Sequence, residues 1–557
     1  MKQHLFRLRK TGWPAVGAML MPLAAFAQSP TSLPVGGVEP PALPVAFSWA
    51  TVVNNGDLLP GSEKVFNSYN QPSVNISGLV VFRARSKGGD GGEPLRGIYS
   101  RDMANPASVV TKVFDTKTTV PDPNNTLYQG QLGTFTEFPA FPRIGISNST
   151  IATRGQSKPV WTYPLPDGSE SRVGTSGVYA MRAGSPVTGA SLLGAVPGFE
   201  YYSVPGAPPG TRFDQFPGAP AVGHSQKVVF KGNYTDPVSL IGKTGIFFRW
   251  ISPDRPKNPV TLIANSDTII PGQVKGGVVR FGSTAPPSAS ARDAVFLGLD
   301  NEESPTLGGI YRAPWESTPP LETLVKLGRQ VPGEAPGTQF SRLGEALSYD
   351  GRFVAFWGSW GSETRDVTLY CPEDGQAAVI AFCKEKYPLG YVVKIPVHQG
   401  FFVHDAELHK TRAVVKTGSE YSDFLYWVFS GRPPGVGDDE SEDFEDPRWR
   451  ASAFTAVYRQ GDKAQVAFKG RKPTVPTTDG IYLTVVPASP QVIRTVVDTN
   501  TPGTLIDPES PAGTKVISVG VERDALRKGW LAITASMLNA TTSESWAGVY
   551  VTRTKVP

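Results

Sequence analysis

Residues 72–82 read Pro72-Ser73-Val74-Asn75-Ile76-Ser77-Gly78-Leu79-Val80-Val81-Phe82, and after a polar loop residues 97–99 read Gly97-Ile98-Tyr99. Aliphatic residues on both sides of an Asn-Ile-Ser-Gly turn predict a strand, a tight turn and a second strand. The Gly-aliphatic-aromatic tripeptide then opens a third strand. Since this unit recurs along the chain, the sequence predicts a repeat architecture.

The third-strand tripeptide occurs seven times, at intervals of 80, 68, 64, 91, 80 and 68 residues. Its copies begin at Gly97, Gly177, Gly245, Gly309, Gly400, Gly480 and Gly548. A predicted strand pair precedes each copy, at 72–82, 142–152, 220–230, 286–296, 346–356, 455–468 and 518–533. A fourth, aliphatic strand is expected after each copy, for example at Val109-Val110, Leu192-Leu193 and Val496-Val497.

Four antiparallel strands repeated seven times predict an all-β fold, the seven-bladed β-propeller. The two ends of the repeat region support this prediction. The chain ends on a third strand beginning at Gly548, whereas residues 47–53 read as a fourth strand that lacks its first three. Pairing these two strands would complete the seventh blade and remove an open sheet edge.

The pattern Asn-x-x-Gly-x-x-Ala/Val-Phe, present here from Asn75 to Phe82, resembles that of a group of secreted bacterial tandem-repeat propeller proteins. More distantly the units are similar to TolB-type and WD40-like repeats. The resemblance covers nearly all of the chain after its first residues, but most copies depart from the pattern, with Gly223 and Ala289 in place of the Asn. It implies an architecture and no catalytic residues.

The first residues are typical of an export signal. A basic start is followed by the apolar run 15–27, which ends in an Ala-x-Ala cleavage site,. We therefore expect a cleaved signal peptide at 1–27, a disordered leader at 28–45 and a single propeller at 46–557. The run is shorter than the roughly 20 apolar residues of a spanning helix. The expected location is secreted or periplasmic, with no membrane span.

Charge and composition narrow the class of partner. The signal carries four basic residues and no acidic ones, so its removal lowers the formal charge from +5 to about +1. A near-neutral chain has no electrostatic reason to bind nucleic acid. We expect a monomer whose partner is an extracellular polymer, glycan or protein.

The only two cysteines, Cys371 and Cys383, lie twelve positions apart. In an exported protein this spacing predicts a disulfide rather than two free thiols. Two cysteines without a nearby histidine pair make a poor zinc site. No metal site is expected from them.

Two connections are much longer than the others, at about 357–399 and 417–454. The first joins strands two and three of one blade, and the second joins strand four to the next blade. Because successive strands run in alternate directions, both loops should meet over one sector of the same face. Long loops on a rigid scaffold often carry function.

These loops supply the candidate ligand-binding residues Trp360, Tyr426, Trp427, Arg432, Arg448 and Trp449. Aromatic rings suit sugar rings or protein side chains, and guanidinium groups suit carboxylates. The residues together would suit an acidic polysaccharide. The alternative, which we favour, is that the aromatic residues form a small core that holds the two loops in place.

An acidic run follows Arg432, with Asp438, Asp439 and Asp443 among its seven carboxylates. Clustered oxygens suit calcium. The spacing lacks the known calcium-loop pattern, however, so a solvated segment is the favoured interpretation. No cofactor is expected.

One histidine, His398, is expected on the face of the long loops, with Asp423 or Glu345 as its nearest acidic partner. His398 with Tyr426 or Tyr387 could transfer protons while Arg432 or Arg448 neutralises a uronate. The leading hypothesis is a binding protein. The alternatives are a lyase or hydrolase that acts on an acidic glycan, and a protein-interaction scaffold.

Overall fold

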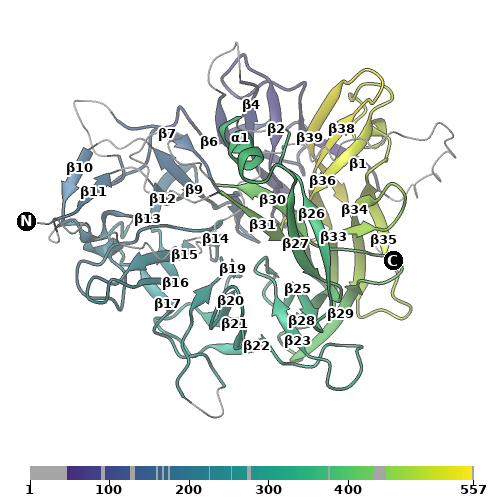
Figure 1. The fold of residues 1–557 in the computed structure, drawn as a ribbon. Coiled ribbons are helices and arrows are strands. Elements are labelled where there is room, and N and C mark those ends of the chain that lie inside the picture. Colours follow the sequence, from purple (N-terminus) through teal and green to yellow (C-terminus); the bar gives the residue numbers. More distant parts are fainter. Residues whose placement is uncertain are drawn as a thin grey trace, which may run out of the picture.

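The computed structural model shows a ring of seven small antiparallel sheets (Figure 1). The expected signal peptide and leader lie outside the residues that it describes. The described residues are 47–88, 94–125, 132–157, 161–165, 168–173, 176–224, 226–252, 254–272, 277–373, 377–431 and 447–554.

The first four blades follow one another along the chain. Blade 1 contains β2 (Phe66–Tyr69), β3 (Ser73–Val74), β4 (Leu79–Ser86), β5 (Arg96–Asp102) and β6 (Thr111–Asp115). Blade 2 contains β7 (Phe135–Glu137), β8 (Arg143–Ile144), β9 (Ile151–Ser157), β12 (Ser176–Arg182) and β13 (Ser185–Ser191). Blade 3 contains β14 (Ala221–Val222), β15 (Lys227–Thr235), β16 (Gly242–Trp250) and β17 (Thr261–Asn265). Blade 4 contains β18 (Ser283–Thr284), β19 (Ser288–Ala289), β20 (Asp293–Leu299), β21 (Gly308–Pro314) and β22 (Glu322–Lys326).

The remaining blades complete the ring. Blade 5 contains β23 (Phe340–Leu343), β24 (Ser348–Tyr349), β25 (Phe353–Trp360), β28 (Gln399–Asp405) and β29 (Lys410–Lys416). Blade 6 contains β32 (Thr455–Gln460), β33 (Lys463–Lys472), β34 (Thr478–Val486) and β35 (Arg494–Asp498). Blade 7 contains β36 (Lys515–Gly520), β37 (Leu526–Arg527), β38 (Trp530–Leu538), β39 (Ser545–Arg553) and β1 (Trp49–Asn54).

Smaller elements occupy the connections between these strands. They are the hairpin β10 (Trp161–Pro164) and β11 (Glu170–Val173), the short 3-10 helices η1 (Leu193–Ala195), η2 (Glu200–Tyr202) and η3 (Gly503–Leu505), the pair β26 (Thr364–Leu369) and β27 (Tyr391–Pro396), helix α1 (Ala377–Lys386), and the pair β30 (Tyr426–Ser430) and β31 (Arg448–Ser452). In the described part of the chain no helix has the length and apolar character needed to cross a membrane.

The two ends of the ring pair as the sequence predicts. Strand β1 lies antiparallel to β39, with Trp49 opposite Thr552 and Asn54 opposite Gly548. Thr552 Oγ1 also donates to the Ser48 carbonyl at 2.7 Å. Blade 7 is thereby completed by the N-terminal strand, and the sheet edge at β39 is covered.

The first strand of most blades is longer than predicted and is interrupted. In blade 1, for example, β2 and β3 both pair with β4. The interruption falls near prolines such as Pro72, Pro142 and Pro286, because proline has no N–H to donate to the ladder,. The predicted fourth strands are present in blades 1 and 2, but the residues expected in them lie just outside: Val109-Val110 precede β6, and Leu192-Leu193 follow β13.

The Asn-x-x-Gly turn of blade 1 is built by its own side chain. Asn75 Oδ1 accepts hydrogen bonds from the backbone N–H groups of Ser77 and Leu79, both at 3.0 Å. Gly78 has a φ of 93°, and a Cβ there would lie 2.7 Å from the Trp530 ring. Glycine is therefore required at this position both for the backbone conformation and for packing against blade 7.

The aromatic residue of each third strand is buried between blades. In blades 1 to 6 it meets, at a steep angle, the ring of a second aromatic residue. In blades 1, 2 and 5 this residue begins strand one, in blades 3 and 4 it lies shortly before strand one, and in blade 6 it is Tyr421, in the long connection that follows β29. The ring pairs are Phe66–Tyr99, Phe135–Tyr179, Phe213–Phe247, Phe281–Tyr311, Phe340–Phe402 and Tyr421–Tyr482, with centroids 4.8–5.3 Å apart. Edge-to-face ring pairs of this kind stabilise the fold beyond the contribution of their buried apolar area. A Cβ at Gly97 would lie 2.7 Å from Tyr99 Oη, which explains the glycine of the tripeptide.

The innermost strand pieces contact one another in a closed cycle, in the order β3, β8, β14, β19, β24, β32 and β37. A buried ion network holds this inner ring together. Asp524 pairs with both Arg143 and Arg527, whose side chains are each 1% exposed. Burial opposes ionisation of Asp524, but the two guanidinium groups outweigh it and hold the pKa below its usual range,.

The same two arginines reach the other blades. Arg143 donates to the Pro287 carbonyl at 3.2 Å and to Ser288 Oγ at 3.0 Å in blade 4. Arg527 donates to the carbonyls of Val457 at 2.9 Å and Tyr349 at 3.3 Å, in blades 6 and 5. The Val74 N–H of blade 1 donates to the Asp524 carbonyl at 3.0 Å. The network therefore joins six of the seven blades.

Replacement of Asp524 by Ala should destabilise the fold by about 3–5 kcal/mol, because two buried guanidinium groups would lose their carboxylate. Urea unfolding of the purified protein would measure this loss. The control is Asp366→Ala, which removes the exposed partner of Lys394 and should cost at most about 1 kcal/mol,. Equal losses for the two variants would contradict the assigned role of the network.

Candidate functional site

The two long connections meet on one face of the ring, as predicted. The first spans 361–398 and contains β26, α1 and β27, while the second spans 417–454 and contains the β30–β31 hairpin. Figure 1 shows this hairpin extending inward over the middle of the ring. Its base packs with central residues of other blades, since Tyr426 and Phe454 share a cluster with Phe141 and Val519.

The hairpin has two different sides because side chains alternate along its strands. In its register, Trp427 lies opposite Ala451 and Phe429 opposite Trp449. This side packs against the first connection. The Phe429 ring lies 6.0 Å from the Tyr387 ring. The two tryptophans pack in the same hydrophobic cluster as Leu369, Val393 and Ile395. The other side carries Tyr426, Val428, Arg448 and Arg450 and faces the ring.

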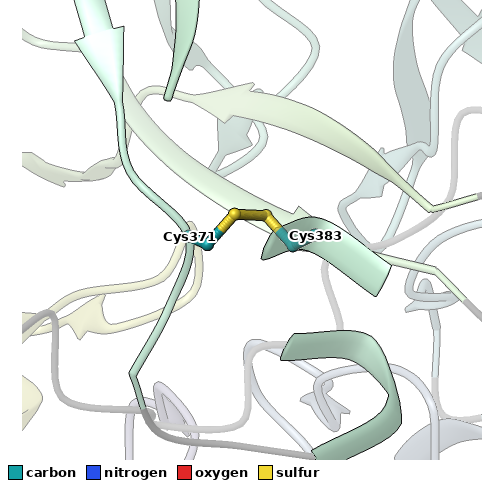
Figure 2. Close-up of a disulfide and its surroundings, with 2 residues drawn as sticks. All are labelled: Cys371 and Cys383. Carbon is teal, nitrogen blue, oxygen red and sulfur yellow. A yellow bond between two sulfur atoms is a disulfide. The ribbon is translucent and has the colours of Figure 1, made fainter. Parts of the chain in front are cut away.

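The disulfide Cys371–Cys383 is confirmed, with an S–S distance of 2.08 Å and a Cα–Cα distance of 5.7 Å. Figure 2 shows that it ties α1 to the chain just after β26. A structural disulfide is typical of proteins in oxidising compartments.

The four predicted aromatic ligand residues serve mainly as packing groups in the structure. Trp360 is buried in the core of blade 5, and its ring lies 5.9 Å from that of Phe402. Tyr426 is buried beneath Lys469, whose Nζ lies 3.8 Å from the ring centroid. Trp427 and Trp449 are partly buried between the two connections. This arrangement matches the small loop core, and ligand contact by these rings stays a prediction.

The predicted catalytic residues belong to different groups of contacts. His398 is half exposed, stacks on Trp360 at 6.1 Å and has its Nε2 3.4 Å from Glu363 Oε2. Asp423 is 2% exposed and accepts hydrogen bonds from Gln399 Nε2 and from two backbone N–H groups, while it pairs with Arg365 at 2.9 Å. Among the described contacts, none joins His398 to Asp423 or Tyr426.

Burial raises the pKa of Tyr426 well above its usual value. That shift disfavours proton release by the phenol near neutral pH. Arg432 and the possible calcium ligands Asp438, Asp439 and Asp443 lie outside the described residues. Within the described ranges no group of three His, Cys, Asp or Glu side chains could hold a metal ion.

The ring-facing side of the hairpin lies over a group of charges that we call the central charged cluster. Its members come from four blades and the hairpin: Lys231, Glu302, Glu345, Arg448, Arg450 and Arg523. Glu345 lies in the break between β23 and β24 of blade 5 and is half-buried. Burial raises its pKa, although Lys231, Arg523, Arg448 and Arg450 all favour its ionised form.

The second carboxylate of the cluster, Glu302, follows β20 in blade 4. Burial and then the negative charge of Glu345 raise its pKa to about 7. Lys231, Arg448 and a hydrogen bond from Ser283 Oγ at 3.3 Å act in the opposite direction. On the far side of the cluster, Arg523 Nη1 is buried and lacks a hydrogen-bond partner among the described residues.

Sequence reasoning had singled out Glu345 and Arg448, but it missed Lys231, Glu302 and Arg523. These three residues belong to blades 3, 4 and 7, and no motif or spacing links them. Only the closure of the ring brings them together.

No protein-family model and no curated protein matches this chain significantly. Among solved structures it is similar to the β-propeller domain of the Trilobed protease from Pyrococcus furiosus, with 10% identity and a TM-score of 0.37 over 89% of this chain and 95% of that one. It is also similar to an acylaminoacyl peptidase, with 8% identity and a TM-score of 0.35 over 84% of this chain and 49% of that one. A Hadza microbial sialidase matches at 12% identity and a TM-score of 0.26 over 66% and 68%. The seven-bladed propeller assignment follows from the strand pairing of this chain.

The pKa of Glu302 predicts a pH-dependent stability. Since the folded-state pKa is about 7 and the ordinary value is 4.5, ionisation of Glu302 destabilises the fold as the pH rises through this window,. Glu302→Gln should therefore be more stable than the wild type by about 1–3 kcal/mol at about pH 8. The gain should disappear below pH 4.5.

Urea unfolding at both pH values measures this difference. The control is Glu303→Gln, which changes an exposed neighbour and should have little effect at either pH. A gain for Glu302→Gln that is equal at both pH values would contradict the shifted ionisation.

Proposed function

We propose that this protein is an exported binding protein that holds an extracellular polymer, glycan or protein at the central charged cluster. The observation that carries the proposal is the position of Arg448 and Arg450, on the ring-facing side of the hairpin and within electrostatic reach of Glu345. The expected signal peptide and the disulfide support an extracytoplasmic location,.

The chemistry of the cluster favours a ligand with both acidic and hydroxyl groups. Guanidinium groups bind carboxylates through two parallel hydrogen bonds, and carboxylates accept hydrogen bonds from sugar hydroxyls. Arg448, Arg450 and Arg523 offer the first kind of contact, while Glu302 and Glu345 offer the second. A uronic-acid polysaccharide carries both groups on each residue and is the ligand class that we propose.

The double replacement of Arg448 and Arg450 by Ala should weaken binding of polygalacturonate oligosaccharides at least about tenfold, because charged hydrogen bonds to the carboxylates are lost. Isothermal titration calorimetry provides the affinity. Neutral dextran serves as the ligand control. The matched protein control is Arg292→Ala, an exposed arginine in the turn between β19 and β20 on the opposite face.

Binding that the double variant leaves unchanged would overturn the assignment of the site. Failure of the wild type to bind any uronic-acid polymer, together with specific capture of an extracellular protein, would favour the interaction scaffold instead.

A second candidate function is glycoside hydrolysis, and the pair Glu302 and Glu345 favours it. Two carboxyl groups, one of which has its pKa raised to about 7 by burial and then by the charge of the other, can act as general acid and as base or nucleophile,. This pair differs from the predicted set of His398, Tyr426 and Asp423, in which no described contact joins His398 to the other two residues.

If the pair is catalytic, Glu302→Gln and Glu345→Gln should each lower the release of reducing ends from an acidic polysaccharide by about 100-fold or more. Glu303→Gln should leave that rate unchanged. Wild-type protein that binds the polymer but releases no reducing ends would exclude hydrolysis and leave the binding function.

A further inference from the structure

A small pocket opens in blade 1, on its side toward blade 2 and apart from the central charged cluster. It is lined by Ser68, Asn70, Arg83, Ala84, Arg85 and Arg96 and holds about 250 Å³ of space, including its open mouth. Three of the six lining residues are arginines, on the adjacent strands β4 and β5. A concentration of guanidinium groups in a concave site is the usual arrangement for binding an anion.

The strand geometry explains why the arginines gather here. Alternate residues of β4 face opposite sides, and Val81 packs in the core shared with blade 2,. Arg83 and Arg85 have the same parity as Val81 and therefore also face blade 2. Arg96 of β5 lies directly opposite Arg85 in the β4–β5 register. Like charges in directly opposed positions destabilise a sheet.

The described partners neutralise only part of this charge. Arg83 donates to Asn70 Oδ1 at 3.0 Å and to Glu137 Oε1 at 2.8 Å, and Arg96 Nε lies 3.4 Å from Glu137 Oε2. In the described part of the chain Glu137 forms ion pairs with Arg83 and Arg96, and no carboxylate forms an ion pair with Arg85. The pocket thus keeps an excess of two positive charges.

Arg85 is the residue best placed to receive a ligand. Its Nε donates to Ser68 Oγ at 2.8 Å, and its two Nη atoms have no partner among the described residues. Burial lowers the pKa of Arg85, and the positive charges of Arg83 and Arg96 lower it further against the effect of Glu137. An anion in the pocket would relieve this repulsion and would be held by the free Nη atoms.

We propose that this pocket is an oxyanion-binding site, which takes a carboxylate, sulfate or phosphate group through Arg85 and Arg96. Glu137 positions Arg83 and Arg96 around the pocket. The site is on a different blade from the central charged cluster and does not depend on the function proposed for that cluster. An acidic glycan could supply such a group, as could a free inorganic anion.

Melting temperatures in sodium sulfate and in sodium glucuronate, compared with sodium chloride at equal ionic strength, test the proposal. A bound anion should raise the wild-type melting temperature by about 1–3 °C at ten times its dissociation constant. Arg85→Gln should abolish this anion-specific rise and should be at least as stable as the wild type in chloride, because a repelled charge is removed. Arg96→Gln, at the more exposed side of the pocket, provides a second variant.

Two controls separate this site from other effects. Arg292 lies on the opposite face, so the Arg292→Gln variant should keep the full rise in melting temperature. This control shows the effect of removing an arginine under the same general salt effects. Arg448→Ala should also keep the rise in sulfate, which distinguishes the pocket from the central charged cluster. A rise with both anions indicates a general oxyanion site, and a rise with one of them identifies the group. No anion-specific rise, or a rise that survives both Arg85→Gln and Arg96→Gln, would overturn the proposal.

Discussion

The ring depends on two buried cations that share one buried anion. Arg143 and Arg527 reach Asp524 from different blades, and their Nη groups also donate hydrogen bonds to blades 4, 5 and 6. Charges removed from water are costly unless such hydrogen bonds accompany the ion pair. These partners lie within hydrogen-bonding distance only when the inner strands form their closed cycle. Any other number or order of blades would leave buried charges without partners and would therefore be less stable.

Around this centre the blades are held by a repeated pair of aromatic rings. The ring of the third strand meets a second ring, which begins the first strand in Phe340–Phe402 and comes from the long connection before blade 6 in Tyr421–Tyr482. In blade 7, Tyr550 instead donates to Asp507 at 3.0 Å. The blade that is built from both ends of the chain therefore uses a hydrogen bond where the others use a ring pair.

The long connections turn this scaffold into a molecule with one distinctive face. The hairpin uses its aromatic side to join the disulfide-linked connection and its charged side to cover the centre of the ring. Aromatic residues in a long loop can indicate either a binding surface or a loop core, and here packing explains most of them. The charges gathered at Glu302, Glu345, Arg448 and Arg450 are the stronger functional signal.

The sequence by itself determined the blade count, the strand pairs, the closure of the ring, the disulfide and the face on which the long connections meet. These features depend on local periodicity and on short-range turn chemistry, which can be read along the chain. It also named Glu345 and Arg448. Only the tertiary structure placed Lys231, Glu302 and Arg523 beside them and paired Arg85 with Arg96. Those groupings depend on which residues of distant strands face each other across the ring or within a blade, and electrostatic coupling acts through space rather than along the sequence.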